Sequence, residues 1–269
     1  MKKPLAAQRF ELTYKAAHLQ CLDKDGAPIT GADASGFIRR EGMELYLYTC
    51  WHVVTGYNVH NLKPERITPT RMTLVVTLQN AQSPLGAENA GHPQRLQVPL
   101  YDSSGLPLWS QDRKNEPLAD SQAINFRVPF SHDAIKLRLP SDASISNVPV
   151  IEEECFLKGS TMMPGDKVLL VGYPRGYCEL GLEQIPPVLL TRFIAATKIP
   201  GHKREFLLDG TGVQGMSGGP VFIERDESIY LLGLYTGSIS PNQTSSESAK
   251  DAALGTCCDM TLCWKRTPL

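Results

Sequence analysis

Apolar and polar residues alternate over short stretches of this chain, which is the pattern of half-buried β-strands. The clearest case is residues 135–139, where Ile135, Leu137 and Leu139 are separated by Lys136 and Arg138. Residues 71–78 are rich in β-branched side chains and also predict a strand. We expect further strands over residues 15–22, 35–40, 43–48, 95–100, 167–171, 188–197, 205–208, 229–235 and 254–264.

Glycine, proline and short polar clusters separate these predicted strands. The 269 residues include 22 Gly and 20 Pro, which indicates many tight turns. Polar, irregular segments at residues 80–93, 111–121 and 238–252 are expected to be surface loops. A Ser-, Asp- and Pro-rich linker over residues 140–149 predicts a boundary between two units, residues 1–140 and 141–269. The sequence shows no repeat, heptad or long amphipathic helix, so the predicted fold class is all-β.

The charge of the chain gives no electrostatic case for nucleic acid or a membrane surface as a partner, because 27 basic residues face 28 acidic ones. No segment approaches the roughly 18 apolar residues of a membrane span. The first residues are basic, but charged and polar side chains interrupt the stretch behind them, so no secretion signal is predicted. We expect a cytoplasmic protein.

The cysteines indicate reduced, mostly buried thiols in a reducing compartment. Their number is odd, two of them are adjacent, and several lie inside apolar runs. They form neither a C-x-x-C pair nor a His/Cys set with zinc-finger spacing, and neither a metal nor a cofactor is predicted. The seven are Cys21, Cys50, Cys155, Cys178, Cys257, Cys258 and Cys263.

Candidate chemistry is concentrated in residues 215–220, Gly-Met-Ser-Gly-Gly-Pro. Glycines on both sides of Ser217 permit backbone dihedrals that let consecutive N–H groups point into one concavity. Ser217 could then attack a carbonyl while the N–H groups of Gly215 and Ser217 hold the oxyanion. The alternative is an ordinary turn, which is what short Gly/Ser clusters usually form.

Phosphate binding is a second alternative for this segment, since residues 210–217 read G-x-x-x-x-G-x-S. A phosphate-binding loop requires a lysine where Met216 stands, followed by a helix. Gly218, Gly219 and Pro220 are a poor start for a helix. The phosphate interpretation therefore fails, and a hydrolase needs a base to activate the serine.

Two earlier residues could complete such a site. His52 ends an apolar stretch and has the near-neutral pKa of a general base, although a histidine there is more often a hydrogen-bonded core residue. Asp133 precedes the strand of residues 135–139 and could orient an imidazole, or could simply cap a turn. Its neighbour His132 is expected at the surface.

Taken in order, these blocks resemble the trypsin-like (chymotrypsin-fold) serine peptidases, and most of all the bacterial type without structural disulfides that includes the Deg/high-temperature-requirement group. The resemblance covers roughly residues 15–262. Its blocks are T-x-x-H-V at 49–53, D-A-I-K-L at 133–137, G-D-x-V with G-Y-P at 165–168 and 172–174, and G-x-S-G-G-P at 215–220. Asp209 matches an aspartate of the Deg-type enzymes and is taken as structural.

The resemblance implies two packed six-stranded antiparallel β-barrels with the active site in the cleft between them. It assigns the general base to His52, the orienting carboxylate to Asp133, the nucleophile to Ser217, and the oxyanion hole to the N–H groups of Gly215, Met216 and Ser217. It places the primary substrate pocket at Thr211, Thr236, Gly237 and Ser238. None of these four is charged, so a small or apolar P1 residue is expected rather than Arg or Lys.

The predicted function is a serine endopeptidase that hydrolyses protein or peptide substrates through an acyl-enzyme. Two alternatives stay open. One is a latent protease that a partner protein activates; the other is a catalytically idle module that keeps the fold to bind a peptide. The spacing from His52 to Asp133 exceeds that of the compact bacterial members, so residues 80–121 are expected to contain insertions.

Overall fold

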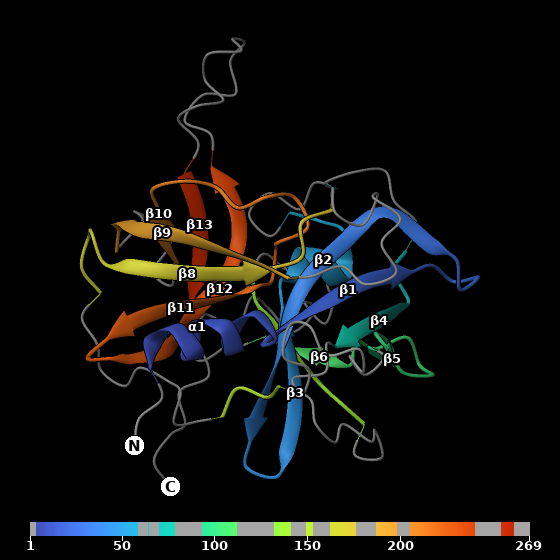
Figure 1. Cartoon of the computed structure of the whole chain (residues 1–269). Helices are drawn as coiled ribbons and strands as arrows, with labels where there is room; N and C mark the ends of the chain where they lie inside the picture. Colours follow the sequence, from blue (N-terminus) through green and yellow to red (C-terminus); the bar gives the residue numbers. More distant parts are fainter. Residues whose placement is uncertain are drawn as a thin grey trace, which may run out of the picture.

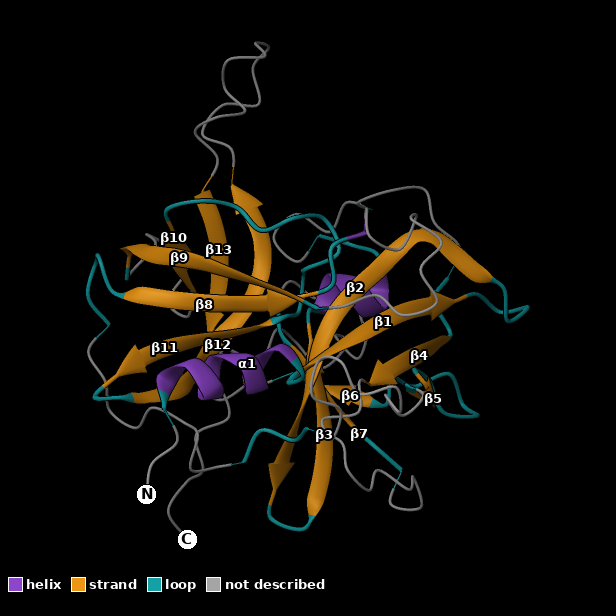
Figure 2. Cartoon of the chain, viewed as in Figure 1, coloured by secondary structure: helices purple, strands orange, loops and turns teal. Residues whose placement is uncertain are grey.

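The computed structural model describes residues 4–58, 64, 70–78, 93–111, 132–140, 149–152, 162–175, 187–197, 205–239 and 254–260. The predicted loops at 80–93, 111–121 and 238–252 and the predicted linker at 140–149 lie largely outside the described residues. The described part of the chain consists of two β-sheet units, which lie side by side in Figures 1 and 2.

Strands from the first half of the chain form one antiparallel sheet of seven strands in the order β5-β4-β1-β2-β3-β7-β6. The long strand β2 pairs with β1 up to Phe37 and with β3 from Phe37 onward, so the sheet curls around this strand. The strands are β1 (Ala16–Leu22), β2 (Pro28–Glu41), β3 (Glu44–Thr49), β4 (Thr73–Leu78), β5 (Gln94–Pro99), β6 (Trp109–Ser110) and β7 (Ile135–Arg138).

Strands from the second half form a closed antiparallel barrel in the order β10-β13-β12-β11-β8-β9, which pairing between β9 and β10 completes. Strands β8 and β11 have runs of consecutive buried residues. Alternate side chains of each strand point into the barrel, and the others pack against neighbouring elements. The strands are β8 (Lys167–Gly172), β9 (Val188–Ala196), β10 (Glu205–Leu208), β11 (Pro220–Arg225), β12 (Ser228–Ile239) and β13 (Leu254–Asp259).

The predicted all-β class is confirmed, and the closed barrel together with the curled sheet forms a two-barrel arrangement of the chymotrypsin type. The first unit differs in detail from the six strands expected, since its described strands number seven and β6 has only two residues.

Two helices were not predicted. Helix α1 (Leu5–Thr13) packs against β12 and β8 of the barrel, and Arg9 Nη2 donates to Glu224 Oε2 at 2.8 Å. Helix α2 (Trp51–Thr55) follows β3 directly and ends at Gly56, whose φ of 79° is left-handed. His52 was expected at the end of a strand, but it lies in α2 because the backbone leaves the sheet after Thr49. In the part of the chain described here, neither helix has the length and apolar character needed to cross a bilayer.

One hydrophobic cluster joins the two units. It contains apolar residues of the first sheet, such as Leu19, Phe37 and Leu47, together with Val171 and Phe222 of the barrel. A second, smaller cluster fills the barrel interior. The contact between the two units is therefore itself packed core.

Candidate active site

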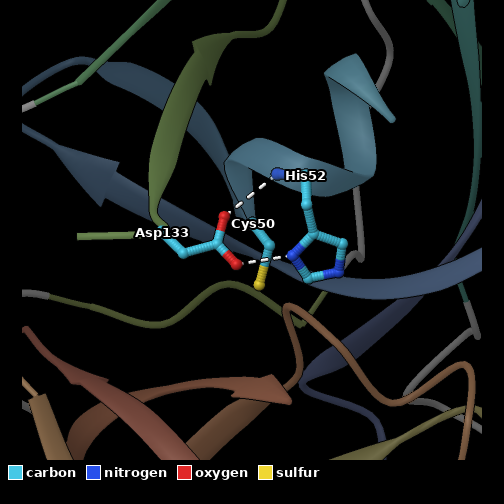
Figure 3. A group of neighbouring side chains, drawn as sticks. All are labelled: Cys50, His52 and Asp133. Atoms are coloured by element: carbon cyan, nitrogen blue, oxygen red, sulfur yellow. Dashed lines mark hydrogen bonds and ion pairs between the residues drawn. The ribbon is translucent and has the colours of Figure 1, made fainter. Parts of the chain in front are cut away.

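His52 and Asp133 are held together by two hydrogen bonds. The N–H of His52 donates to Asp133 Oδ1 at 3.0 Å, and His52 Nδ1 lies 2.5 Å from Asp133 Oδ2. Both residues are buried, with 9% and 5% of their surfaces exposed. In Figure 3 the aspartate lies at the entry to its strand and points at both the backbone and the ring of His52. Helix α2 and strand β7 thus bring together two residues that are 81 positions apart.

This contact fixes the tautomer of the imidazole. An ionised carboxylate can only accept, so the proton on the His52 ring belongs on Nδ1 and leaves Nε2 as an acceptor. Nε2 is the ring nitrogen that faces away from Asp133 in Figure 3. Arg71 Nη1 donates to the carbonyl oxygen of His52 at 2.8 Å and also to that of Val53. The end of α2 is therefore anchored on the side opposite the aspartate.

The loop that carries Ser217 is fastened to β2 through Ser35. Ser35 N–H donates to Ser217 O at 2.9 Å, and Ser35 Oγ donates to Gly215 O at 2.8 Å. The same hydroxyl accepts the N–H of Tyr173 at 2.8 Å, so one buried serine ties two segments of the second unit to the first. Gly218, with φ of 86°, also approaches β2: a Cβ there would lie 2.2 Å from Ser35 O.

Two backbone N–H groups of this loop remain candidates for oxyanion donors. Within the described residues, neither Gly215 N–H nor Ser217 N–H donates to a protein acceptor. Met216, which the sequence also suggested as an oxyanion donor, is different because its N–H donates to Val213 O at 3.0 Å. That turn bond uses the donor, so the candidate oxyanion hole reduces to Gly215 and Ser217.

His52, Gly215 and Ser217 line a common pocket of about 100 Å³. Residues 31–34 of β2, Val53, Arg71 and Gln214 complete its lining. Asp33 brings a negative charge to this pocket, and its Oδ1 lies 3.3 Å from His18 Nε2. The pocket thus lies between the two units, with the histidine on one side and the serine on the other.

The four predicted substrate-pocket residues lie elsewhere, since none of them lines this pocket. Thr236 is buried and donates to Thr256 Oγ1 at 2.9 Å, while Ser238 is exposed. The carbonyl of Thr211 accepts two hydrogen bonds from the guanidinium of Arg192, at 3.2 and 2.8 Å. Gly237 has a φ of 148° and open space beside its Cα. Their role as a substrate pocket stays a prediction.

Cys50 lies behind the His52–Asp133 pair, as Figure 3 shows. Its thiol donates to Tyr235 O at 3.3 Å, and potential metal-ligand atoms of the three residues lie within 4.8 Å of one another. A metal bound by both His52 and Asp133 would need its two ligand atoms further apart than the 2.5 Å observed, since each would stand about 2 Å from the metal at a wide angle. The contact has the geometry of a hydrogen bond.

Four cysteines are described, Cys21, Cys50, Cys257 and Cys258, and all four are buried thiols, as expected. Burial raises the pKa of the Cys21 thiol to about 11, although the nearby Arg71 guanidinium opposes the effect. Burial also raises the pKa of Cys257 well above its usual value. Cys155, Cys178 and Cys263 lie outside the described residues.

Two further ionisable residues near the site were not anticipated. His132, expected at the surface, is completely buried because it precedes Asp133 at the point where the chain enters the core. Glu205 on β10 is 4% exposed, and its burial raises the pKa of its carboxyl to about 7, with a further contribution from the charge of Asp133. No local pattern marks Glu205, because its surroundings arise from strand pairing with β13.

No protein-family profile and no curated protein sequence matches the chain. Among solved structures, the protease Anisep from Arthrobacter nicotinovorans is similar, with a TM-score of 0.50 and 11% sequence identity. The similarity covers 91% of this chain and 90% of that one. At this identity the comparison shows a shared fold, and it agrees with the two-barrel architecture.

Proposed function

We propose that this protein is a serine endopeptidase. The observation that carries the proposal is the two-point hydrogen bonding of His52 by Asp133, next to a pocket that His52 shares with Ser217. A binding module would have no use for an imidazole held in one tautomer by a buried carboxylate. A nucleophilic serine needs such a base.

In the proposed reaction, His52 Nε2 takes the proton of Ser217 as the hydroxyl oxygen attacks the substrate carbonyl. Asp133 stabilises the imidazolium that forms, and the N–H groups of Gly215 and Ser217 donate to the oxyanion. His52 then protonates the leaving amine, and the acyl-enzyme forms. A water molecule then attacks the acyl-enzyme, with His52 again acting as base and then as acid, and the carboxylic acid product leaves as Ser217 regains its proton. The resemblance to the Deg/high-temperature-requirement group and the cytoplasmic location remain parts of this proposal.

A fluorophosphonate probe tests the proposal, because it reacts with serines activated in this way. We expect labelling of the wild type and of Ser104→Ala, which alters a serine in an exposed turn, and none of Ser217→Ala or His52→Ala. Turnover of a peptide substrate should fall on the order of 10⁴-fold or more in the last two variants.

The same experiment separates the alternatives. Labelling that appears only after a cell extract is added would support a latent protease with an activating partner. Folded protein that stays unlabelled under every condition, and that hydrolyses no peptide, would overturn the enzymatic proposal in favour of a binding module.

A further inference from the structure

The two sides of Ser217 differ in what they offer a substrate. His52 protonates the leaving amine, so the pocket that His52 lines with residues 31–34 and Arg71 receives the leaving part. The acyl part must lie on the other side of the serine loop. Strand β12 lies there, since Tyr235 O accepts the N–H of Gly218 at 2.7 Å and Tyr235 N–H donates to Gly219 O at 2.9 Å.

The side chain of Tyr235 fills the space on this acyl side. Its hydroxyl oxygen accepts the N–H of Gly212 at 2.8 Å, and only 3% of the residue is exposed. A Cβ added to Gly212 would lie 2.8 Å from Cε1 and 2.9 Å from Cζ of this ring. A Cβ added to Gly255 on β13 would lie 3.3 Å from Cε2. The space between Gly212 and Gly255, where a substrate side chain could otherwise enter, is therefore occupied by the ring of Tyr235.

The surroundings of the ring are fixed. Arg192 holds the carbonyl of Thr211 with two hydrogen bonds, so the segment that covers one side of the ring is anchored to β9. The ring also packs with the apolar residues of the barrel interior, among them Met216 and Leu170. Moving the ring aside would break its bond to Gly212 and expose this core. In the folded protein without substrate, the ring of Tyr235 therefore occupies the side of the serine loop where the acyl part of a substrate would bind.

We propose that Tyr235 closes the primary specificity pocket and restricts the P1 residue to glycine, alanine or a side chain of similar size. The inference rests on the proposed function, and it goes beyond the absence of charge at Thr211, Thr236, Gly237 and Ser238. Steric filling excludes aromatic and long basic P1 side chains alike, whatever the charge of the lining.

The test uses peptidyl diphenyl phosphonates that are identical except for Ala, Phe or Lys at P1, and it measures the rate at which each labels Ser217. In the wild type we expect the Ala probe to react about 100-fold faster than the Phe or Lys probe. Tyr235→Ala should raise the Phe rate relative to the Ala rate at least 10-fold. Tyr235→Phe keeps the ring and loses only the bond to Gly212, so it should retain the wild-type preference.

The outcomes distinguish this inference from the function on which it rests. Absence of labelling by every phosphonate and by a small fluorophosphonate would remove the proposed function, and the inference with it. Labelling of Ser217 with equal rates for Ala, Phe and Lys would leave the peptidase and overturn the role of Tyr235. A folded Tyr235→Ala with an unchanged ratio would overturn it too. Should Tyr235→Ala not fold, Tyr235→Leu, which keeps an apolar core residue, provides the same comparison.

Discussion

At the scale of single residues, the Asp133 carboxylate serves two donors at once, the backbone N–H and the ring Nδ1 of His52. An asparagine could still accept from one of them. If its oxygen accepts the backbone N–H, its NH₂ group faces Nδ1 of the ring and favours the tautomer with the proton on Nε2. In the proposed reaction, Nε2 must be unprotonated to take the proton of Ser217.

We therefore expect Asp133→Asn to lower kcat by about 10⁴-fold while the protein stays folded. Hydrolysis of a peptide substrate, with circular dichroism as the check on folding, measures this. Asp102→Asn, in an exposed turn where Oδ1 accepts two backbone N–H groups, is the matched control and should keep wild-type turnover. Equal activities of the two variants would contradict the assigned role of Asp133.

Glu205 makes the stability of the protein depend on pH. Its pKa is raised from 4.5 to about 7 in the folded protein by burial, with the charge of Asp133 as a second cause. The folded state thus binds a proton that the unfolded state has released between these two values, and stability falls as pH rises from about 4.5 to about 7. The loss amounts to roughly 3 kcal/mol above pH 7.

Glu205→Gln removes this proton uptake, so its free energy of unfolding should decline less than that of the wild type between pH 5 and pH 8. Urea unfolding of both proteins at the two pH values measures the difference. Parallel pH profiles would show that the Glu205 carboxyl is ionised in the folded protein at neutral pH.

Residue type and local pattern brought forward His52 at the end of an apolar stretch, Asp133 before a strand, and Ser217 between glycines. The structure places the first two in hydrogen-bond contact and puts Ser217 on the same pocket as His52. Glu205 and Tyr235 could not be found in this way. Their surroundings come from cross-strand pairing with Cys258 and Cys257, which no local pattern in the sequence records.

At the scale of elements, the serine loop depends on its contact with β2. Gly218 is held where a Cβ would lie 2.2 Å from Ser35 O and 2.3 Å from Thr49 Oγ1. Gly26, in the turn between β1 and β2, has a similar φ of 76° but open space around it. Comparing substitutions at Gly218 and Gly26 therefore separates the free-energy cost of the left-handed φ from the cost of the steric clash with β2 and β3.

We expect Gly26→Ala to destabilise the protein by about 1 kcal/mol through its dihedral alone. Gly218→Ala should cost roughly 3 kcal/mol or more, because backbone displacement adds to the same strain. Thermal unfolding followed by circular dichroism compares them. Equal shifts in Tm would mean that the loop can move away from β2 at little cost.

Strand positions followed from the alternating pattern because packing on one face of a sheet imposes it. The helices did not, for two reasons. Helix α2 has only five residues and is wholly shaped by its contacts with the core. Helix α1 has a single buried residue, Leu12, so its sequence carries little of the periodicity that marks a helix.

At the scale of the whole molecule, the two units share a core. The cluster that contains Phe37 and Leu47 of the first sheet also contains Tyr173, Phe222 and Leu234 of the second unit. Neither unit could separate without exposing these residues to water. The boundary near residues 140–149 stays a prediction, and the hydrophobic packing runs from the sheet of β1–β7 into the barrel of β8–β13.

We accordingly expect a single cooperative unfolding transition. Tryptophan fluorescence, to which the buried Trp51 and Trp109 of the first half contribute, should follow the same denaturant curve as the far-ultraviolet circular dichroism of all strands. Two separated transitions would show that the shared cluster contributes little to stability.

The fastening of the serine loop to Ser35 has a further consequence for the newly made chain. His52 and Asp133 are synthesised before Ser217. The carbonyl oxygen of Ser217 is held in place only when the N–H of Ser35, in the first half of the chain, donates to it. Strand β13, which closes the barrel beside it, is translated later still. If the proposed function holds, we expect a chain truncated before β13 to have no peptidase activity, because it carries His52, Asp133 and Ser217 but lacks the strand that pairs with β12 and closes the barrel.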